Sequence, residues 1–347
     1  MFEQFIGTKP VEERHRIDTA ALEKYLGFKI GKIEQFKGGQ SNPTYKINDQ
    51  YVLRRKPPGK LLPSAHAVDR EYKVIKALYE TKFPVARPHV LCEDENVIGT
   101  MFYLMEYVEG RVLWDPALPG MTREQRAAIW DEKNRVISEL HKVDYRAVGL
   151  EDFGKPGNYI GRQVERWSKQ YRASETQKIE AMDHLIDWLP KNIPPEAGTS
   201  VVHGDFRLDN TIFHATEARI LAVLDWELST LGDPLADFAY HCMGFHIPPD
   251  KFRGVAGLDI AALGIPSEAE YVAKYLKRTG RNSIDPSHWD FYLAYNLFRI
   301  AAICQGIAKR VLDGTAASAF AAEAASKTVP LADLGWRQVE RILRRAA

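Results

Sequence analysis

The pattern of apolar and polar positions changes about a third of the way along the chain. In the first third, short β-prone apolar runs alternate with turn residues, which predicts a small antiparallel sheet. One amphipathic helix interrupts these runs, because apolar residues recur every three or four positions over residues 66–80. The strand-like runs cover residues 30–37, 44–48, 51–55, 97–98 and 101–108.

Beyond Gly110 long helical patterns dominate, and they predict a second part that is mostly helical. The Ala-rich residues 315–326 predict a further helix that packs closely through small side chains. The main helical runs cover residues 123–142, 161–172, 178–189, 269–279 and 288–312, and β-prone runs at 200–202, 211–213 and 220–224 interrupt them. The interruption is dense in polar residues, so it is where we expect chemistry.

Composition indicates a globular protein with almost no net charge. Of the 347 residues, 45% are hydrophobic and 27% charged, and 47 Lys and Arg oppose 46 Asp and Glu, giving +1. That balance excludes a mainly disordered chain. It also provides no global field that would attract nucleic acid or an anionic membrane, so we expect neither partner and any phosphate site must be local.

The three cysteines are few, far apart and in no paired spacing. Cys92, Cys242 and Cys304 therefore predict neither a disulfide framework nor a zinc site, and they fit a reducing compartment. The first residues show no basic segment followed by an apolar run, and no apolar run reaches about 18 residues. We expect a cytoplasmic protein.

The strongest chemical signal is the segment Val-Val-His-Gly-Asp-Phe-Arg-Leu-Asp-Asn at residues 201–210, followed by Leu-Asp-Trp-Glu at 224–227. Phosphoryl transfer needs a carboxylate to hold the acceptor hydroxyl and oxygen ligands to hold Mg²⁺ on the phosphates. The Asp-x-x-x-x-Asn spacing of Asp205 and Asn210 matches a kinase catalytic loop, and Asp225 supplies a second acid.

Two other interpretations of this segment exist. Asp and Asn residues often do no more than satisfy tight turns. Gly204, Asp205 and Asp209 also look superficially like the Gly-Asp-x-x-Asp motif of two-metal phosphoesterases. The spacing has one residue too many for that motif, and its Asp-x-His and Gly-Asn-His partners are missing, so a two-metal site would lack most of its ligands.

In combination, His203-Gly204-Asp205, Asn210 and Leu-Asp-Trp-Glu closely resemble the aminoglycoside phosphotransferases and choline kinases. The likeness extends from about residue 30 to about 244, and the pattern is most similar to the phosphotransferase-like domains joined to, or encoded near, acyl-CoA dehydrogenases. It implies a protein-kinase-like bilobal α+β fold. An N-terminal nucleotide-binding lobe, residues 1–107, would hold the antiparallel sheet and one helix. A larger, mostly helical lobe, residues 108–347, would hold the catalytic loop and the acceptor-binding helices.

The resemblance also implies roles for the residues of the motif. Asp205 would be the catalytic base or hydroxyl-orienting group, and Asn210 and Asp225 would be Mg²⁺ ligands. Glu227 is a weaker metal candidate, because it lies where choline kinases have an acid near the second metal. We leave open whether one or two metal ions bind.

His203 and Asp237 are expected to be structural, with Asp237 in the position of the family's buried aspartate that binds the catalytic-loop backbone. Gly204 stands where protein kinases carry an arginine that answers activation-loop phosphorylation. Asp-Phe-Gly, Ala-Pro-Glu and a loop long enough to dock a peptide are also missing. These absences favour small-molecule substrates over proteins.

The nucleotide phosphates need donors, and the Gly-rich turn within residues 36–45 resembles the family's phosphate-binding hairpin. Gly39 and Ser41 are therefore candidates, although a Gly-Gly turn by itself is usually only a hairpin. Arg54 stands where the fold places the cation that binds the α- and β-phosphates, a lysine in protein kinases. Its expected partner is Glu71. Arg55 could be the inward-facing arginine instead, and period-two alternation places Arg54 on the same side as Val52 rather than Leu53.

Residues 105–110 would form the hinge that joins the two lobes. Adenine needs one backbone acceptor and one backbone donor, and alignment on the terminal glycine proposes the Glu106 carbonyl and the Val108 amide. This assignment depends on the resemblance and on the change of composition at this point.

Other conspicuous polar and aromatic residues are expected to be structural. A metal site at His241, Cys242 and His246 is disfavoured, because helix geometry makes the first two diverge. His141 is expected to pack and cap at a helix end. The expected core residues of the second part are Trp167, Tyr171, Tyr295 and Arg299.

These inferences predict a phosphotransferase that binds Mg-ATP between the lobes and moves the γ-phosphoryl group to a hydroxyl of a small metabolite. The acceptor could be an aminoglycoside, an amino alcohol, a sugar or a hydroxyacyl thioester, and near-neutral charge disfavours a polycationic aminoglycoside. The alternative is a nucleotide-binding sensor or scaffold without turnover. Whether the protein uses ATP or GTP, and whether it assembles into a homodimer, stays open.

Overall fold

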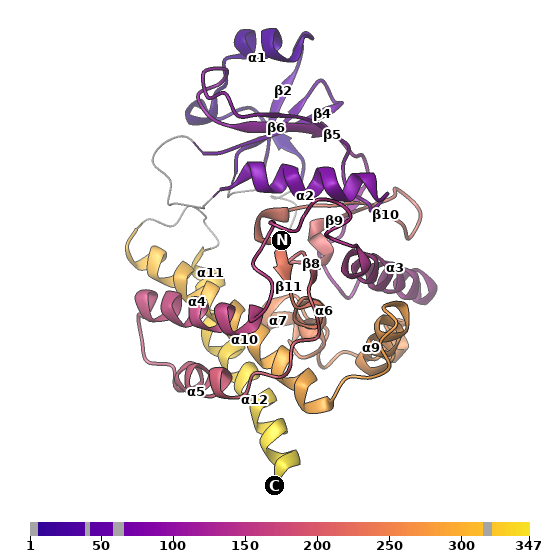
Figure 1. Ribbon diagram of the computed structural model, residues 1–347, viewed down its shortest axis with the longest axis vertical. Coiled ribbons are helices and arrows are strands. Elements are labelled where there is room, and N and C mark those ends of the chain that lie inside the picture. Colours follow the sequence, from indigo (N-terminus) through magenta and orange to yellow (C-terminus); the bar gives the residue numbers. More distant parts are fainter. Residues whose placement is uncertain (1–5, 39–41, 58–65, 315–320) are drawn as a thin grey trace. The chain divides into compact units, whose positions relative to one another are not determined.

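A computed structural model describes residues 6–38, 42–57, 66–314 and 321–347, and it divides into two compact units (Figure 1). Unit 1 comprises Met1–Trp114, Asp144–Phe153 and Leu208–Ser229, and unit 2 comprises Asp115–Val143, Gly154–Arg207 and Thr230–Ala347. Unit 1 thus includes two segments from later in the chain. The lobe boundary proposed at residue 107 stays a prediction.

The main element of unit 1 is a six-stranded sheet of order β1-β2-β3-β4-β6-β5, in which every pairing is antiparallel. Helix α2 packs against β5 and β6 (Figure 1). A smaller sheet has the order β10-β9-β7. The elements are β1 Thr8–Lys9, α1 Thr19–Leu26, β2 Ile33–Phe36, β3 Thr44–Ile47, β4 Tyr51–Arg55, α2 Val68–Glu80, β5 Pro88–Cys92, β6 Phe102–Glu106, β7 Arg111–Val112, β9 Thr211–Phe213 and β10 Ile220–Val223.

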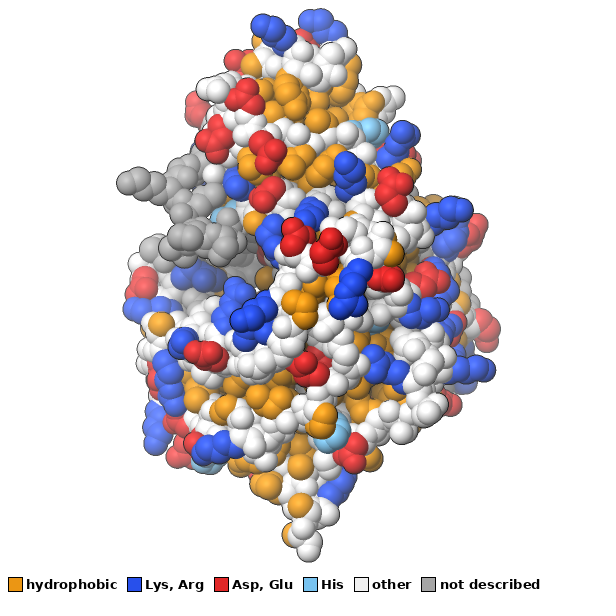
Figure 2. Space-filling model, viewed as in Figure 1, with side chains coloured by type: hydrophobic (Ala, Val, Ile, Leu, Met, Phe, Trp, Pro, Cys, Tyr) orange, Lys and Arg blue, Asp and Glu red, His pale blue; other side chains and the backbone are white. Residues whose placement is uncertain are grey.

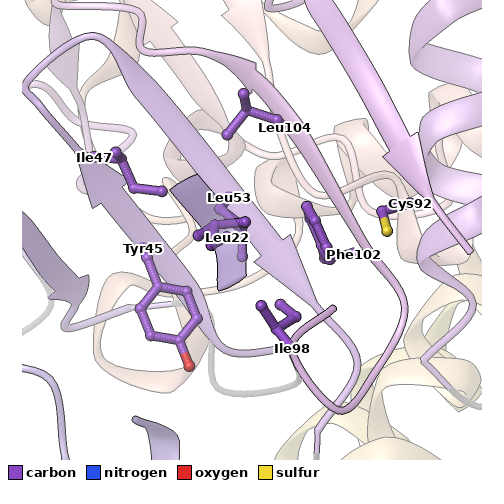
Figure 3. Packing of buried hydrophobic residues seen from close by; sticks show 8 residues of the cluster. All are labelled: Leu22, Tyr45, Ile47, Leu53, Cys92, Ile98, Phe102 and Leu104. Atoms are coloured by element: carbon purple, nitrogen blue, oxygen red, sulfur yellow. The ribbon is translucent and has the colours of Figure 1, made fainter. Parts of the chain in front are cut away.

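A buried apolar cluster joins the sheet of unit 1 to α1 (Figure 3). Alternate residues of β3 and β4 point to the same face, so Tyr45, Ile47 and Leu53 lie together with no exposed surface. Leu22 of α1 completes the cluster on that face. Helix α1, which the sequence pattern did not predict, begins at the Asp18 cap and contributes only this one buried residue.

One strand prediction in unit 1 was wrong. Residues 97–98 form a turn rather than a strand, and the amide of Gly99 donates to the Glu95 carbonyl at 2.7 Å. Ile98 is apolar because it packs into the core cluster. Strand β5, which the sequence pattern did not predict, begins at Pro88, and an edge strand tolerates the missing N–H of proline.

Unit 2 is mostly helical, as predicted, with one two-stranded sheet of β8 and β11. The elements are α3 Arg123–Lys142, α4 Tyr159–Ser174, α5 Glu180–Trp188, β8 Ser200–Val202, β11 Thr230–Gly232, α6 Pro234–Cys242, α7 Pro249–Phe252, α8 Ile260–Leu263, α9 Glu268–Arg278, α10 Pro286–Leu312, α11 Ala321–Ala325 and α12 Thr328–Ala346. Of the predicted Ala-rich helix, residues 315–320 lie outside the described chain and α11 forms the rest.

Helix α10 is the central helix of unit 2 and packs against α4, α6, α11 and α12. Of the described helices it alone is long and apolar enough to cross a membrane, but 83% of its apolar window is buried inside the protein. Such burial is typical of a core helix. On the surface, basic and acidic side chains are interspersed over the face shown in Figure 2.

Candidate functional site

Adjacent arginines at the end of β4 point to opposite faces of the sheet in unit 1. The Arg55 Nε donates to the Tyr45 hydroxyl at 3.0 Å, on one face. On the other face, the Arg54 Nε lies 2.9 Å from the Glu71 Oε2. That N–H is poorly aligned with the acceptor, so the contact is an ion pair rather than a linear hydrogen bond. The predicted Arg54–Glu71 contact is present.

Glu71 is a buried carboxylate with further donors around it. It is 2% exposed, and it accepts hydrogen bonds from the Asn42 Nδ2 at 2.9 Å and the Tyr103 hydroxyl at 3.1 Å. Burial raises the pKa of Glu71, and the nearby Arg54 charge opposes that rise. These three partners hold Glu71 in one orientation, and Glu71 in turn orients Arg54.

The same guanidinium reaches the acids that follow β10. The Arg54 Nη2 lies 3.0 Å from the Asp225 Oδ1 and 3.6 Å from the Glu227 Oε2. Burial would lower the pKa of Arg54, but the carboxylates of Glu71 and Asp225 outweigh it and the pKa is raised, so Arg54 stays charged. Arg54 therefore links α2 to the Leu-Asp-Trp-Glu turn within unit 1.

The backbone around Asp225 has an uncommon conformation. Asp225 has φ 65° and ψ 63°, a left-handed region that Asp tolerates better than most residues. On one side of it, the Leu224 amide donates to the Asn210 carbonyl at 2.8 Å. On the other, the Trp226 Nε1 donates to the Val223 carbonyl at 3.0 Å, and Trp226 is buried. These bonds fix the turn and place the Asn210 backbone beside the end of β10.

The oxygen donors of this turn suit a hard divalent cation. Asp225 and Glu227 supply carboxylate oxygens and Asn210 an amide oxygen, and Mg²⁺ prefers such ligands. Within the described residues, no group of three or more His, Cys, Asp or Glu side chains could hold a metal ion. The proposed ligands are two acids and one amide, which is not a group of that kind. The chemistry of these oxygen donors fits Mg²⁺, and their role as metal ligands stays a prediction.

In unit 2, Asp237 of α6 holds the backbone of the His-Gly-Asp segment. Its Oδ2 accepts from the His203 amide and its Oδ1 from the Gly204 amide, both at 2.8 Å. This is the backbone contact that we predicted for Asp237. Gly204 has φ 82°, a conformation that is strained for other residues. The local backbone conformation therefore explains why glycine stands where protein kinases carry arginine.

His141, at the end of α3, also binds Asp237. Its Nε2 lies 3.1 Å from the Asp237 Oδ2 and its Nδ1 2.7 Å from the Tyr275 hydroxyl. Burial would raise the pKa of Asp237, but bonds from His141 and the His203 amide hold it below its ordinary value. Asp237 is therefore a buried, ionised carboxylate that three donors stabilise.

Asp205 lies beside two side-chain donors in unit 2. The Tyr240 hydroxyl donates to the Asp205 Oδ1, and the Arg207 Nε lies 3.0 Å from the same oxygen. The Asp205 amide donates to the His203 Nδ1 at 3.1 Å. With 17% of its side chain exposed, Asp205 is accessible from solvent but held by its neighbours.

The structure does not test the nucleotide-binding roles predicted for the remaining four residues. Gly39 and Ser41 lie outside the described residues. Glu106 is the last residue of β6, and its amide donates to the Arg87 carbonyl at 2.9 Å. Val108 follows in an irregular segment and is partly buried. The phosphate and adenine roles of these four residues stay predictions.

Sequence reasoning did not connect the side chains of His141, Tyr240 and Arg299 with the surroundings of the His-Gly-Asp segment, although it expected His141 and Arg299 to be structural. The Arg299 Nη2 donates to the Gly204 carbonyl at 2.7 Å, and Arg299 is 5% exposed. A signal existed for Tyr240, because it lies three residues after Asp237 and so on the same helix face. An arginine within the mostly apolar residues 291–304 of α10 was a weaker signal for Arg299.

Comparison with known proteins decides the family. A sequence model of the phosphotransferase enzyme family matches residues 32–275. The chain belongs to the phosphotransferase enzyme family. A Ralstonia eutropha JMP134 protein, described with its crystal structure as a candidate aminoglycoside phosphotransferase, is 56% identical, with a TM-score of 0.85 and coverage of 94% of this chain and 99% of that one.

More distant solved phosphotransferases share the protein-kinase-like fold. The ADP-bound aminoglycoside phosphotransferase APH(2'')-Ib is 17% identical, with a TM-score of 0.56 over 92% of this chain and 99% of that one. Among curated proteins, mouse acyl-CoA dehydrogenase family members 10 and 11 are 49% and 42% identical over 95% and 97% of this chain. The phosphotransferase chain spans only 32% and 45% of those two proteins.

Proposed function

We propose that this phosphotransferase uses ATP and Mg²⁺ to phosphorylate a hydroxyl group of a small metabolite. The observation that carries the proposal is the position of Arg54, ion-paired at once with Glu71 of α2 and with Asp225 after β10. A kinase needs a fixed cation for the nucleotide phosphates near the acid that binds the metal. Unit 1 contains both groups.

Within unit 1, Arg54 would bind the α- and β-phosphates, and Asn210 and Asp225 would hold the metal, with Glu227 as a further ligand. Bound Mg²⁺ would neutralise charge on the phosphate oxygens. The amides of the turn that contains Gly39 and Ser41 would bind the phosphates, and the backbone of Glu106 and Val108 would bind adenine. ADP- and ATP-bound aminoglycoside phosphotransferases of the same fold support a nucleotide substrate.

Within unit 2, Asp205 would orient the acceptor hydroxyl and take its proton as the oxygen attacks the γ-phosphorus. A bond forms between that oxygen and phosphorus, the bond from phosphorus to the β–γ bridging oxygen breaks, and ADP leaves. Asp237 keeps the loop backbone in place through the His203 and Gly204 amides. Asp205 is then presented in a fixed position.

The relatives' names make one acceptor class the first to test. The curated relatives are named as acyl-CoA dehydrogenase family members. Acyl-CoA dehydrogenases act on acyl thioesters, so a hydroxyacyl thioester is the acceptor that suits a phosphotransferase joined to such an enzyme. Amino alcohols and sugars are the other acceptors that the family resemblance allows. The near-zero net charge gives no reason to favour a polycationic aminoglycoside.

The proposal is tested by ADP release from Mg-ATP across a panel of hydroxyacyl thioesters, amino alcohols, sugars and aminoglycosides. We expect at least one class to raise the rate above the acceptor-free rate, and chelation of the metal to abolish the increase. Calorimetry measures Mg-ATP binding in parallel. Binding without acceptor-dependent ADP release would favour a nucleotide sensor or scaffold instead.

Arg54→Lys is expected to weaken Mg-ATP binding by about tenfold. Lysine keeps the positive charge but lacks the planar guanidinium whose N–H groups contact two acids at the same time. Calorimetry with Mg-ATP measures the change. Arg55→Lys is a matched control, since Arg55 lies on the opposite face of β4 and binds Tyr45. Equal affinities for both variants would contradict the proposed phosphate role of Arg54.

A further inference from the structure

One face of helix α6 contacts both the backbone and the side chain of the His-Gly-Asp segment. Asp237 accepts from the amides of His203 and Gly204. Tyr240, three residues later, donates its hydroxyl hydrogen to the Asp205 Oδ1. Residues three apart are neighbours on a helix surface, so a single turn of α6 makes both contacts.

The environment of Tyr240 keeps its hydroxyl protonated, so that the hydroxyl remains a hydrogen-bond donor. Its side chain is buried, with 3% of the residue exposed. Burial raises the pKa of Tyr240 well above its ordinary value, and the Asp205 charge raises it further. The hydroxyl therefore keeps its proton at every pH at which the protein would work, and it can always donate to Asp205.

Arg299 of α10 supports this contact from behind. Its guanidinium carbon lies 5.1 Å from the centre of the Tyr240 ring and 5.6 Å from that of Trp167. Its Nη2 donates to the Gly204 carbonyl, and its Nε is buried without a hydrogen-bond partner among the described residues. A buried cation is costly, and the contacts of this one lead to Tyr240 and to the segment that carries Asp205.

We propose that Tyr240 is a positioning residue for Asp205, holding its carboxylate in one rotamer with Arg299 as support. This inference rests on the proposed function, because it concerns the group that would take the acceptor's proton. The ring of Tyr240 also fills the core, so only the hydroxyl tests the proposal. Misplacing a reacting group by about 1 Å is enough to slow a reaction by ~10²-fold.

The test compares Tyr240→Phe with Tyr171→Phe. Tyr171 is a matched control, because its hydroxyl is also buried but has no hydrogen-bond partner among the described residues. With the best acceptor of the panel, we expect Tyr240→Phe to lower kcat by about ten- to a hundredfold and to leave KM for Mg-ATP unchanged. Tyr171→Phe should keep the wild-type kcat. A wild-type kcat in Tyr240→Phe would overturn the proposal.

A double-mutant cycle separates positioning from a general structural effect. If Tyr240 acts through Asp205, Tyr240→Phe should cost nothing further in an Asp205→Asn background, because interacting residues are not additive. If the two losses multiply, Tyr240 acts elsewhere and the proposal fails.

Crystal structures of the wild type and of Tyr240→Phe give a readout that needs no turnover. We expect one Asp205 rotamer in the wild type and more than one in the variant. An unchanged single rotamer would overturn the positioning role. If the wild type releases no ADP with any acceptor, the proposed function fails, and the rotamer comparison still decides the contact between Tyr240 and Asp205.

Discussion

Replacing Asp205 with asparagine is expected to slow acceptor-dependent ADP release by roughly 10²–10⁴-fold, the effect typical of losing a general base. Asparagine has nearly the same shape, and its amide oxygen can still accept a hydrogen bond from Tyr240, but it cannot take a proton. Affinity for Mg-ATP, measured by calorimetry, should not change, because the proposed phosphate and metal ligands belong to other residues. A wild-type rate would remove Asp205 from its role.

Asp209→Asn is the control that separates two kinds of phosphate chemistry. Asp209 would be a metal ligand in a two-metal phosphoesterase, the pattern that the spacing of this segment disfavours. In a phosphotransferase with the proposed ligands, Asp209→Asn should keep a rate close to that of the wild type. A loss as large as that of Asp205→Asn would contradict the assignment.

Asp237→Ala is expected to destabilise the protein by about 3–5 kcal/mol, the cost of removing one partner from a buried charged network. The substitution leaves the His203 and Gly204 amides and the His141 ring without their shared acceptor. Thermal unfolding should show a midpoint lower by roughly 10 °C. Asp187→Ala, which removes an exposed partner of Lys191, should change stability by less than about 1 kcal/mol.

The effect of Asp237 should depend on pH in a definite direction. Its pKa in the folded protein lies below the ordinary value of 3.8. The carboxylate therefore contributes stability that is fully present above the unfolded pKa and is lost as the pH falls through the folded pKa. The difference in midpoint between wild type and Asp237→Ala should shrink below about pH 4. A constant difference down to pH 2 would contradict this account.

Much of the fold was predictable because its signals are local. Helix α3 begins and ends where the apolar period predicted, and a capping box of Thr122 and Gln125 marks its start. Strands β4, β8 and β9 also have the predicted bounds. Helix α12 was missed, because it begins at Thr328, the preceding Lys327 provides no side-chain cap, and Pro330 lies in its first turn.

The site divides in the same way into local and tertiary parts. Arg54, Glu71 and Asp237 could be paired with their partners because motif position and strand alternation fix which way they point. His141 and Arg299 are 64 and 94 residues from Asp205 in the sequence. His141 contacts Asp237, and Arg299 contacts the Gly204 carbonyl. Both contacts arise from helix packing, and no local sequence pattern records such packing.

The charges around Arg54 have a consequence for the order of binding. One guanidinium contacts three carboxylates, those of Glu71, Asp225 and Glu227. When all three acids are ionised, the cluster has an excess of two negative charges, and a bare triphosphate would be repelled. A divalent ion cancels that excess, so the nucleotide is expected to bind together with the metal or after it, and not before it.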